Sequence, residues 1–417
     1  MTLKVEDSSK SAGCRKTRLA LLWMNLTSEP LIALYTLLPF ILRKDLGAST
    51  LQLSIFITLR PVLSVFSFYW SAYLTNRKNT LLSNLMGAWL LARLPFLLLP
   101  WVNNVWFLLF AAGVYQLFSK AGTPALIEIL KVNIPKKPRE HIFSFYYVLS
   151  FVESVVLGLT IGDILDGSGS NWRLLFFISS LIGLSSIFVQ MRIPIQKKED
   201  ASHERPSLNK LFIEPWKNCF RLIKSRPDFA HFQWGFMIGG FELMLIAPAL
   251  SIFYADVLSV SHANIAVARF ILMGIGVVCS SVFWRKGIGG ISLPKLICFV
   301  LVGFVMFPLV LLFAQTNVVF FYLAFLLYGV AQAGSHLIWN LSGTLFAPEE
   351  DSFQFSNVNI LMVGLRGAVG PLLGGVLCSL FGATTVLALG VGIAFYGAWY
   401  MLAKNPAKLP KKAVIET

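Results

Sequence analysis

Apolar stretches of about 20 residues, separated by short polar turns, follow one another along the whole chain. A stretch of that length crosses a hydrocarbon core about 30 Å thick when it forms an α-helix. Twelve stretches qualify, centred near residues 30, 61, 90, 118, 153, 182, 242, 272, 303, 329, 366 and 393. The pattern therefore predicts an all-α membrane protein with twelve transmembrane helices.

The longest polar stretch, residues 192–228, divides the predicted spans six and six. This division predicts five parts, and both tails and the linker are expected in the cytoplasm. The parts are an N-terminal tail at 1–18, an N-terminal six-helix bundle at 19–193, a basic linker at 194–228, a C-terminal six-helix bundle at 229–403 and a C-terminal tail at 404–417.

The predicted linker carries apolar side chains at helical spacing, with basic side chains between them. The apolar positions are Leu208, Phe212, Trp216, Phe220 and Ile223, and the basic ones are Lys217, Arg221 and Lys224. Such a stripe is typical of a helix that lies in the inner headgroup region of a membrane. A basic linker that simply joins the two bundles is the alternative.

The composition agrees with a membrane protein. The chain is 56% hydrophobic and 13% charged, whereas a soluble domain carries roughly 25% charged residues. The first apolar stretch, residues 19–42, is too long for the apolar part of a signal peptide, so we interpret it as the first span. The five cysteines fall singly along the chain, which favours neither a zinc site nor a disulfide framework.

A net charge of +15 raises the question of a nucleic-acid partner. Most Lys and Arg residues, however, fall in the two tails and in the loops that a cytoplasmic N-terminus places inside. The loops on the other side carry only Arg43, Lys44 and Arg173. This is the asymmetry that orients membrane proteins with their basic loops in the cytoplasm. We therefore expect both termini to be cytoplasmic and no nucleic acid to bind.

The two predicted bundles resemble each other. Residues 113–120 (GVYQLFSK) and 329–336 (GVAQAGSH) share Gly, Val, Gln and Ser in the same order. Further correspondences occur along the chain, with offsets between 208 and 213 residues. They pair Glu29 with Glu242, Arg60 with Arg269, Arg77 and Lys78 with Arg285 and Lys286, residues 143–148 with 353–358, and the spacing Gly158–Gly162 with Gly370–Gly374. The pattern indicates two parallel six-helix repeats, and internal repeats are typical of transporters.

Three further stretches carry a family resemblance. They are NWRLLFF at 171–177, RGAVGPLLGG at 366–375 and the basic turn SAYLTNRKN at 71–79, which has Ser71 and Thr75 where the family has Gly and Asp. With the six-plus-six layout, they make the chain similar to the major facilitator superfamily of secondary transporters. The resemblance implies that spans 1, 4, 7 and 10 line a central cavity, that spans 2, 5, 8 and 11 lie beside them, and that spans 3, 6, 9 and 12 are outer supports.

Eight charged residues lie near the middle of predicted spans. They are Glu29, Arg60, Arg93, Lys120, Glu153, Glu242, Arg269 and Arg366. Each costs roughly 2.5–3.5 kcal/mol at the centre of a bilayer on insertion scales. We therefore expect these side chains to pair with one another or to line a wet cavity. Arg93 is the exception, because its position near the outer end of span 3 predicts that it reaches the interface by snorkelling.

The remaining polar positions in the spans fall on shared helix faces and give a candidate site. Gln116 and Lys120 share one face, as do Gln332, His336 and Asn340. We predict two groups. Substrate-binding residues are Gln116, Lys120, Gln332, His336, Asn340, Arg366, Arg60 and Arg269, and proton-coupling residues are Glu29, Glu153 and Glu242. The alternative is that some of these charges only brace helices, as ion pairs of Glu29 with Arg60 and of Glu242 with Arg269.

The balance of these charges points to the solute. The candidate site has more permanent cations than acids, and Arg suits planar carboxylate or phosphate groups. We therefore predict a secondary active transporter for a small anionic or zwitterionic organic solute, working by alternating access with the proton as coupling ion or by exchange. No phosphate-binding loop or nucleophile–base arrangement occurs, so we expect neither enzyme activity nor a cofactor.

Two other functions remain open at this point. One is an exporter of amphipathic drugs or lipids, which the many aromatic residues would suit. The other is a membrane receptor or structural protein that has a transporter-like fold and does not transport. In each case we expect a monomer that crosses the cell membrane, an inner or plasma membrane, many times.

Overall fold

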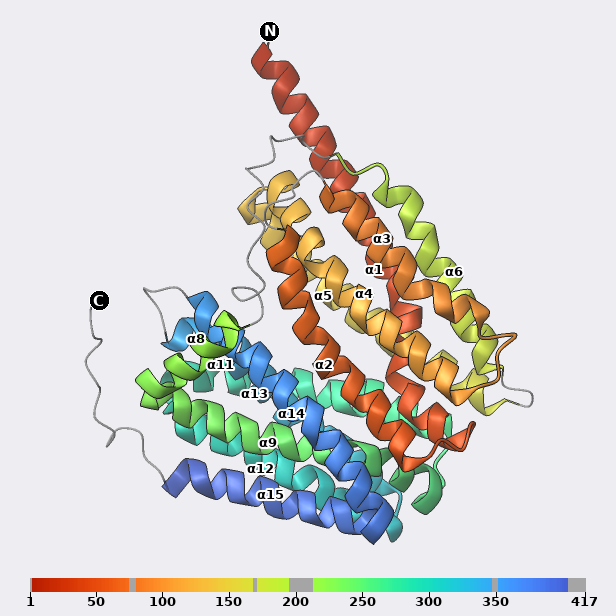
Figure 1. Cartoon of the computed structure of the whole chain (residues 1–417), viewed down its shortest axis with the longest axis vertical. Helices are drawn as coiled ribbons and strands as arrows, with labels where there is room; N and C mark the ends of the chain where they lie inside the picture. The colour runs from red at the N-terminus through yellow and green to blue at the C-terminus, as the bar shows by residue number, and fades with distance from the viewer. Residues whose placement is uncertain (1, 75–79, 168–170, 195–212, 347–351, 404–417) are drawn as a thin grey trace. The chain divides into compact units, whose positions relative to one another are not determined.

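The structure is a computed structural model that describes residues 2–74, 80–167, 171–194, 213–346 and 352–403. Every regular element in these ranges is helical (Figure 1). The first half of the chain contains α1 Thr2–Lys44, α2 Thr50–Leu74, α3 Leu81–Arg93, α4 Val105–Asn133, α5 Lys136–Asp166 and α6 Trp172–Gln190. The second half contains α8 Glu214–Ser225, α9 Pro227–Ile252, α10 His262–Ala266, α11 Met273–Gly290, α12 Leu293–Leu312, α13 Val319–Phe346, α14 Ser352–Phe381 and α15 Ala383–Ala403.

Eleven helices of the described part are long and apolar enough to cross a membrane. A shorter apolar helix, Thr50–Phe66, lies where the sequence predicts the second span. The prediction of an all-α, multi-pass membrane protein is therefore confirmed. The number twelve, the internal repeat and the orientation of the termini stay predictions.

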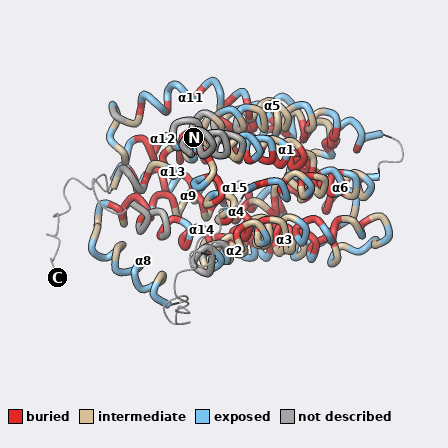
Figure 2. The backbone as a smooth tube through the Cα atoms, turned by 90° about the horizontal axis from the view of Figure 1, so that it is seen from above, coloured by how far each residue is buried: buried red, intermediate tan, exposed pale blue. Residues whose placement is uncertain are grey.

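Lipid-facing surfaces account for many of the exposed positions. Figure 2 shows buried and exposed residues alternating along the helices. Large apolar side chains are among the exposed ones, including Phe188, Leu380 and Phe395, each more than 60% exposed. A soluble protein rarely leaves so much apolar surface in contact with water, so these faces fit the hydrocarbon of a bilayer.

The helix ends have local causes in the sequence. Asn104 begins α4, and its side chain accepts a hydrogen bond from the backbone N–H of Trp106. Asn171 does the same for α6 through Leu174. These asparagines satisfy N–H groups that have no partner within the helix. Gly382, between α14 and α15, has a φ of +82°, a backbone conformation that favours glycine.

The chain divides into two compact units, each described here by itself. The first unit consists of Met1–Leu38 and Leu63–Ser207, and the second of Pro39–Val62 and Leu208–Thr417. The end of α1, the following turn and the start of α2 thus belong to the second unit.

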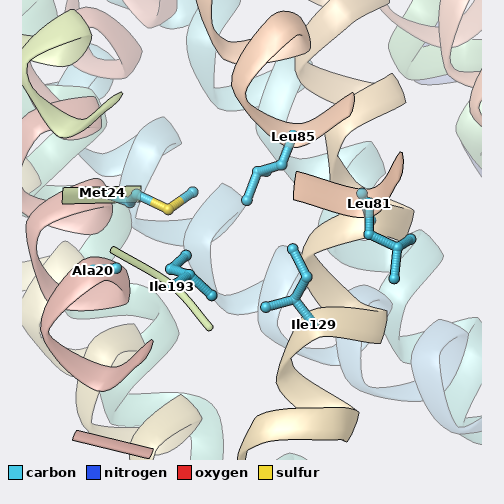
Figure 3. Packing of buried hydrophobic residues seen from close by; sticks show 7 residues of the cluster. Ala20, Met24, Leu81, Leu85, Ile129 and Ile193 are labelled. Carbon is cyan, nitrogen blue, oxygen red and sulfur yellow. The ribbon is translucent and has the colours of Figure 1, made fainter. Parts of the chain in front are cut away.

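The first unit has its core between α1, α3 and α4. Figure 3 shows Met24 of α1 and Leu85 of α3 in this cluster, together with Ala20, Leu81, Ile129 and Ile193. All of these side chains are buried. Ile193 follows the end of α6, so the cluster also fixes the chain where the first bundle ends.

In the second unit, α9 packs against α14 and α15, and α12 packs against α13 and α15 (Figure 1). Glycines allow the backbones to approach closely. A Cβ on Gly374 of α14 would collide with the carbonyl oxygen of Leu245, and one on Gly329 of α13 would collide with that of Met273. Small residues at such crossings are characteristic of helix packing in membranes. The helices α9, α11, α13 and α14 therefore hold their polar residues at fixed positions.

The predicted linker is described at residue 194 and from residue 213 onward, where α8 Glu214–Ser225 forms a short helix. Phe220 is exposed on this helix and Cys219 is buried. Leu208 and Phe212, two of the apolar positions in the predicted stripe, lie outside the described residues, as do the C-terminal tail and the family turn at residues 75–79. The interfacial location of the helix stays a prediction.

Candidate functional site

Three cationic or titratable side chains come together in the second unit. Arg60 lies on α2 and His336 lies on α13. Arg269 lies on a π-helical segment, Val267–Leu272, which precedes α11. Arg60 is close enough to act electrostatically on both Arg269 and His336. All three side chains are exposed. None of them forms an ion pair with a carboxylate among the described residues.

The placement of Arg269 has a local cause. A π-helical turn inserts an extra residue and rotates the side chains that follow it, and such turns occur frequently at functional sites. The residues 267–272 form such a turn within an otherwise α-helical span. The sequence predicts a charge in this span but carries no signal of the local change in helix type.

Two tyrosines, which the sequence analysis did not single out, lie beside this cationic cluster of Arg60, Arg269 and His336. Tyr254 and Tyr328 both interact electrostatically with Arg269. The Gln332 side chain donates a hydrogen bond to the hydroxyl of Tyr328, whose ring stacks on Phe307 with 4.3 Å between centroids. Tyr328 lies one helical turn before Gln332, and this spacing was the available signal in the sequence.

The predicted polar face of α13 continues beyond His336. Asn340 lies one turn further along and is also exposed. Gln332 is half-buried. The helix thus presents an amide, an imidazole and a second amide at successive turns, which can offer hydrogen bonds to a polar solute.

Arg366 of α14 is held against α9. Its Nη1 donates a hydrogen bond of 2.5 Å to the carbonyl oxygen of Phe236, and its guanidinium lies 5.3 Å from the ring centroid of Trp339. A Cβ on Gly240 would collide with this guanidinium, so the glycine makes room for the charge. Arg366 Nε has no hydrogen-bond partner among the described residues. The side chain is therefore fixed in position and still has donor capacity.

Glu242 of α9 is completely buried, with an exposed fraction of 0%. Neither carboxyl oxygen has a hydrogen-bond partner within the described part of the chain. An ion pair between Glu242 and Arg269 is the alternative that the sequence leaves open. That ion pair is not formed in the described part of the chain. Tyr328 is near enough to interact electrostatically with Glu242, and the carboxyl group faces Gly390 of α15.

The other two acids form a polar group in the first unit. Glu29 of α1 accepts a hydrogen bond from the hydroxyl of Ser154 on α5, and Glu153 interacts electrostatically with Glu29. Ser150 donates to Asn25 Oδ1 over 2.9 Å. One Glu153 carboxyl oxygen is buried without a hydrogen-bond partner among the described residues. The structure thus brings Glu29 and Glu153 together, as a pair of acids on neighbouring helices.

Gln116 and Lys120 lie one turn apart on α4 in the same unit. Gln116 is buried and Lys120 is half-buried. Lys120 belongs to the first unit, and Arg366 and His336 belong to the second. Their assignment to one substrate-binding site stays a prediction.

The prediction for Arg93 is wrong. Its side chain does not reach an interface but is only 3% exposed. The guanidinium stacks 3.8 Å above the ring of Trp89, and it donates hydrogen bonds of 3.2 Å to the Trp89 carbonyl oxygen and to Ser28 Oγ. The position along the span cannot reveal this, because the burial comes from neighbouring helices.

The described residues contain no group of three or more His, Cys, Asp and Glu side chains arranged to hold a metal ion. The arrangement can instead bind charged groups and exchange protons. It combines exposed cations and a buried acid in one unit with a pair of acids in the other.

Comparisons with known proteins identify the family. The chain matches the family model described as Major Facilitator Superfamily over residues 23–356, and no curated protein matches it. A solved nucleoside transporter, NupG, has 14% identity and a TM-score of 0.71 over 93% of this chain and 99% of its own. A peptide transporter, POT, has 14% identity and a TM-score of 0.73 over 94% of each chain. A bacterial homolog of the human lysosomal transporter Spinster has 14% identity and a TM-score of 0.59, covering 94% of this chain and 98% of its own.

At such identities the solved structures show the same fold and do not by themselves transfer a substrate. The family match covers well over half of the chain, and it agrees with the resemblance inferred from the sequence. The chain belongs to the Major Facilitator Superfamily.

Proposed function

We propose that this protein is a secondary active transporter that carries a small anionic or zwitterionic organic solute by alternating access. The cationic cluster of Arg60, Arg269 and His336 is the observation that carries this proposal. These residues come from three different helices, and all three side chains are exposed. The solute's anionic group would bind there.

The energetics favour an anion at this place. Two guanidinium groups that act on each other repel, and no carboxylate of the described residues neutralises either of them. Near a protein surface such repulsion is screened less than in bulk water. A carboxylate or phosphate would relieve it, and a guanidinium binds either group through two parallel hydrogen bonds.

The surroundings favour an organic solute over a simple inorganic anion. Tyr254 and Tyr328 provide aromatic surface beside Arg269, and Asn340 is an exposed amide on the same helix as His336. Apolar walls with a few polar groups are typical of small-molecule sites. Among the solved structures of this fold are a nucleoside transporter and peptide transporters, and a peptide is a zwitterion.

Alternating access requires contacts that can break. In the second unit, the end of α1 and the turn after it are attached to the segment between α9 and α10 by ion pairs and a hydrogen bond, and Phe40 packs edge-on against His262. Arg43 pairs with Asp256, Lys44 donates a 3.0 Å hydrogen bond to the Val260 carbonyl oxygen, and Asp45 pairs with His262. The Arg43–Asp256 pair is partly exposed, and such pairs stabilise by only about 1 kcal/mol or less. We assign to them the closing of one end of the transport path.

Proton coupling, or exchange of one solute for another, would involve the three acids. Glu242 is buried without a hydrogen-bond partner in the described residues, and Glu29 and Glu153 interact with each other. An ionised carboxylate in such a position costs several kcal/mol when nothing compensates its charge. Proton exchange at these acids can therefore be linked to opening and closing of the path.

A ligand screen followed by a transport assay tests the proposal. Purified protein is first screened by thermal shift against organic acids, amino acids and peptides. Each stabilising compound is then assayed for uptake into proteoliposomes, with and without an imposed pH gradient. We expect at least one compound with an anionic group to be transported.

A matched pair of variants identifies the site. Arg269→Gln should weaken binding of the transported compound about tenfold or more, because a hydrogen bond to a charged group contributes about 1.5–3 kcal/mol. Arg221→Gln, on the exposed surface of α8, should leave binding unchanged. Equal binding by wild type and Arg269→Gln would contradict the proposed site. If the protein instead transports only neutral amphipathic compounds, and inverted vesicles accumulate them, the result would support an exporter.

A further inference from the structure

The first unit contains a cavity of about 400 Å³ between α1, α3, α4 and α5. All of its lining residues belong to this unit. Its volume is within the range of about 300–1,000 Å³ that is usual for small-molecule sites. Arg60, Arg269 and His336 of the cationic cluster are not among its lining residues.

The walls of the cavity are largely apolar and aromatic. Trp89, Tyr115 and Phe118 line it, and so do Met24 and Leu85 of the buried cluster shown in Figure 3. That cluster closes one side of the cavity with tightly packed side chains. An apolar or aromatic group would therefore find favourable contacts inside.

Arg93 is the charged residue of the lining. It is 97% buried, since only 3% of its surface is exposed. No carboxylate of the described residues forms an ion pair with it. The contacts with Trp89 and Ser28 compensate part of the cost of burying the cation, but they supply no negative charge. A buried cation without a counter-ion is unfavourable by several kcal/mol.

The guanidinium retains hydrogen-bonding capacity. A guanidinium has five N–H donors, and the two described hydrogen bonds use one on each Nη. Arg93 Nε lies against Gly183 of α6, so the second N–H of each Nη is the remaining donor capacity. The side chain is also held in place, because a Cβ on Gly183 of α6 would collide with it. Arg93 is thus a fixed, buried cation in the wall of a cavity.

We propose that this cavity is a second binding site, for a compound that joins a carboxylate to an apolar or aromatic body. The carboxylate pairs with Arg93, and the body lies against Trp89, Tyr115 and Phe118. Ser119 of α4 and Asn25 of α1 also line the cavity and can provide further hydrogen bonds. This site does not depend on the transport function proposed above.

The proposal is tested by calorimetric titration of the full-length protein in lipid nanodiscs. The probe is 4-phenylbutyrate, and its neutral amide, 4-phenylbutanamide, is the matched control compound. We expect the carboxylate to bind at least about tenfold more tightly than the amide, because the amide cannot form the charged hydrogen bonds with Arg93. Equal binding of the two compounds, or no binding of the carboxylate at millimolar concentration, overturns the proposal.

Two variants locate the probe. Arg93→Gln removes the cation, and Thr123→Trp fills the cavity from an exposed lining position on α4. Each should weaken binding of 4-phenylbutyrate about tenfold or more. Ile127→Trp adds the same ring at an exposed position of α4 that does not line the cavity, and it should bind like wild type. If Arg93→Gln does not fold, Thr123→Trp carries the test.

A third variant separates this site from the transport site. Arg269→Gln should bind 4-phenylbutyrate like wild type, because Arg269 does not line the cavity. Loss of binding in Arg269→Gln, together with normal binding in Thr123→Trp, overturns the proposal and places the probe at the cationic cluster. If only Thr123→Trp loses binding of 4-phenylbutyrate, the result supports the second site. This holds whether or not the chain transports the solute proposed above.

Discussion

Asp45 and His262 are 217 residues apart in the sequence, and their side chains meet over 2.9 Å, from Asp45 Oδ2 to His262 Nε2. The imidazole is almost fully buried, and Phe40 approaches it edge-on with 5.1 Å between ring centroids. Arg43 and Asp256 form a second attachment beside it. The turn after α1 is therefore fixed to the turn between α9 and α10 by charges and by aromatic packing.

A covalent crosslink at this contact should stop transport. In a background without the native cysteines, the pair Asp45→Cys and His262→Cys should be bridged by a short, reducible bis-methanethiosulfonate reagent, which spans the length of the two side chains that meet here. Under alternating access these turns must separate, so uptake should fall to background and recover after reduction. Each single cysteine variant is the control. Full uptake by the crosslinked protein would show that the contact is static.

Replacing Glu242 should abolish the proton coupling of transport and leave folding intact. The carboxyl group of Glu242 has no hydrogen-bond partner among the described residues, so Glu242→Gln removes an ionisable group and breaks no observed contact. We expect normal insertion and solute exchange, but no accumulation driven by a pH gradient. Proteoliposome uptake, with and without the gradient, measures the difference. If accumulation persists, Glu242 does not carry the coupling proton.

Replacing Lys120 tests whether the first unit contributes to the binding site of the transported solute. If it holds the solute's anionic group, Lys120→Gln should weaken binding by about 1.5–3 kcal/mol, as expected for a hydrogen bond to a charged group. Lys131→Gln, on the exposed surface of the same helix, provides the control. Titration calorimetry with the transported solute distinguishes them. Unchanged affinity in a folded Lys120→Gln variant would assign Lys120 to helix packing.

Gly183→Ala should destabilise the first unit, because the added methyl group would collide with the Arg93 guanidinium. Since Arg93 is buried and hydrogen-bonded to Ser28, it cannot move away at low cost. We expect a loss of about 1–3 kcal/mol, typical of overpacking. Gly87→Ala on α3 is the matched control, since its Cβ would meet nothing within 4 Å. Thermal unfolding in detergent should show a lower midpoint for Gly183→Ala only.

Cys219 on α8 should react slowly with maleimides. Its side chain is 2% exposed, and burial raises the pKa of the thiol to about 11. Because the thiolate is the reactive form, labelling should be slow at pH 7.5 and should accelerate about tenfold per pH unit up to that pKa. Mass spectrometry of the modified protein measures the rate.

The neighbouring position provides the control and a test of topology. Asn218 is exposed, so a single cysteine introduced there as Asn218→Cys, without the native cysteines, should label readily at pH 7.5. If the linker is cytoplasmic, a membrane-impermeant maleimide should reach it in inverted vesicles and not in intact cells. Labelling from outside intact cells would contradict the predicted orientation.

The sequence by itself determined the class of the protein. The apolar stretches predict membrane helices because the thickness of a bilayer sets their length, and the cost of a charge in hydrocarbon marks residues such as Glu242 and Arg269 as important. Both properties depend on the local sequence. The family resemblance also came from short stretches of sequence, and the family match confirms it.

Only the tertiary structure decided what surrounds each charge. Arg93 is buried because Ser28 of α1, Trp89 of α3 and Gly183 of α6 meet around it. Arg269 and Arg60 come together, with Tyr328 beside Arg269, because the start of α2, the π-helical turn and α13 belong to one unit. Helical spacing shows which residues share a face, but it does not show which helix covers that face. That depends on how side chains from distant parts of the chain pack, which local hydropathy does not encode.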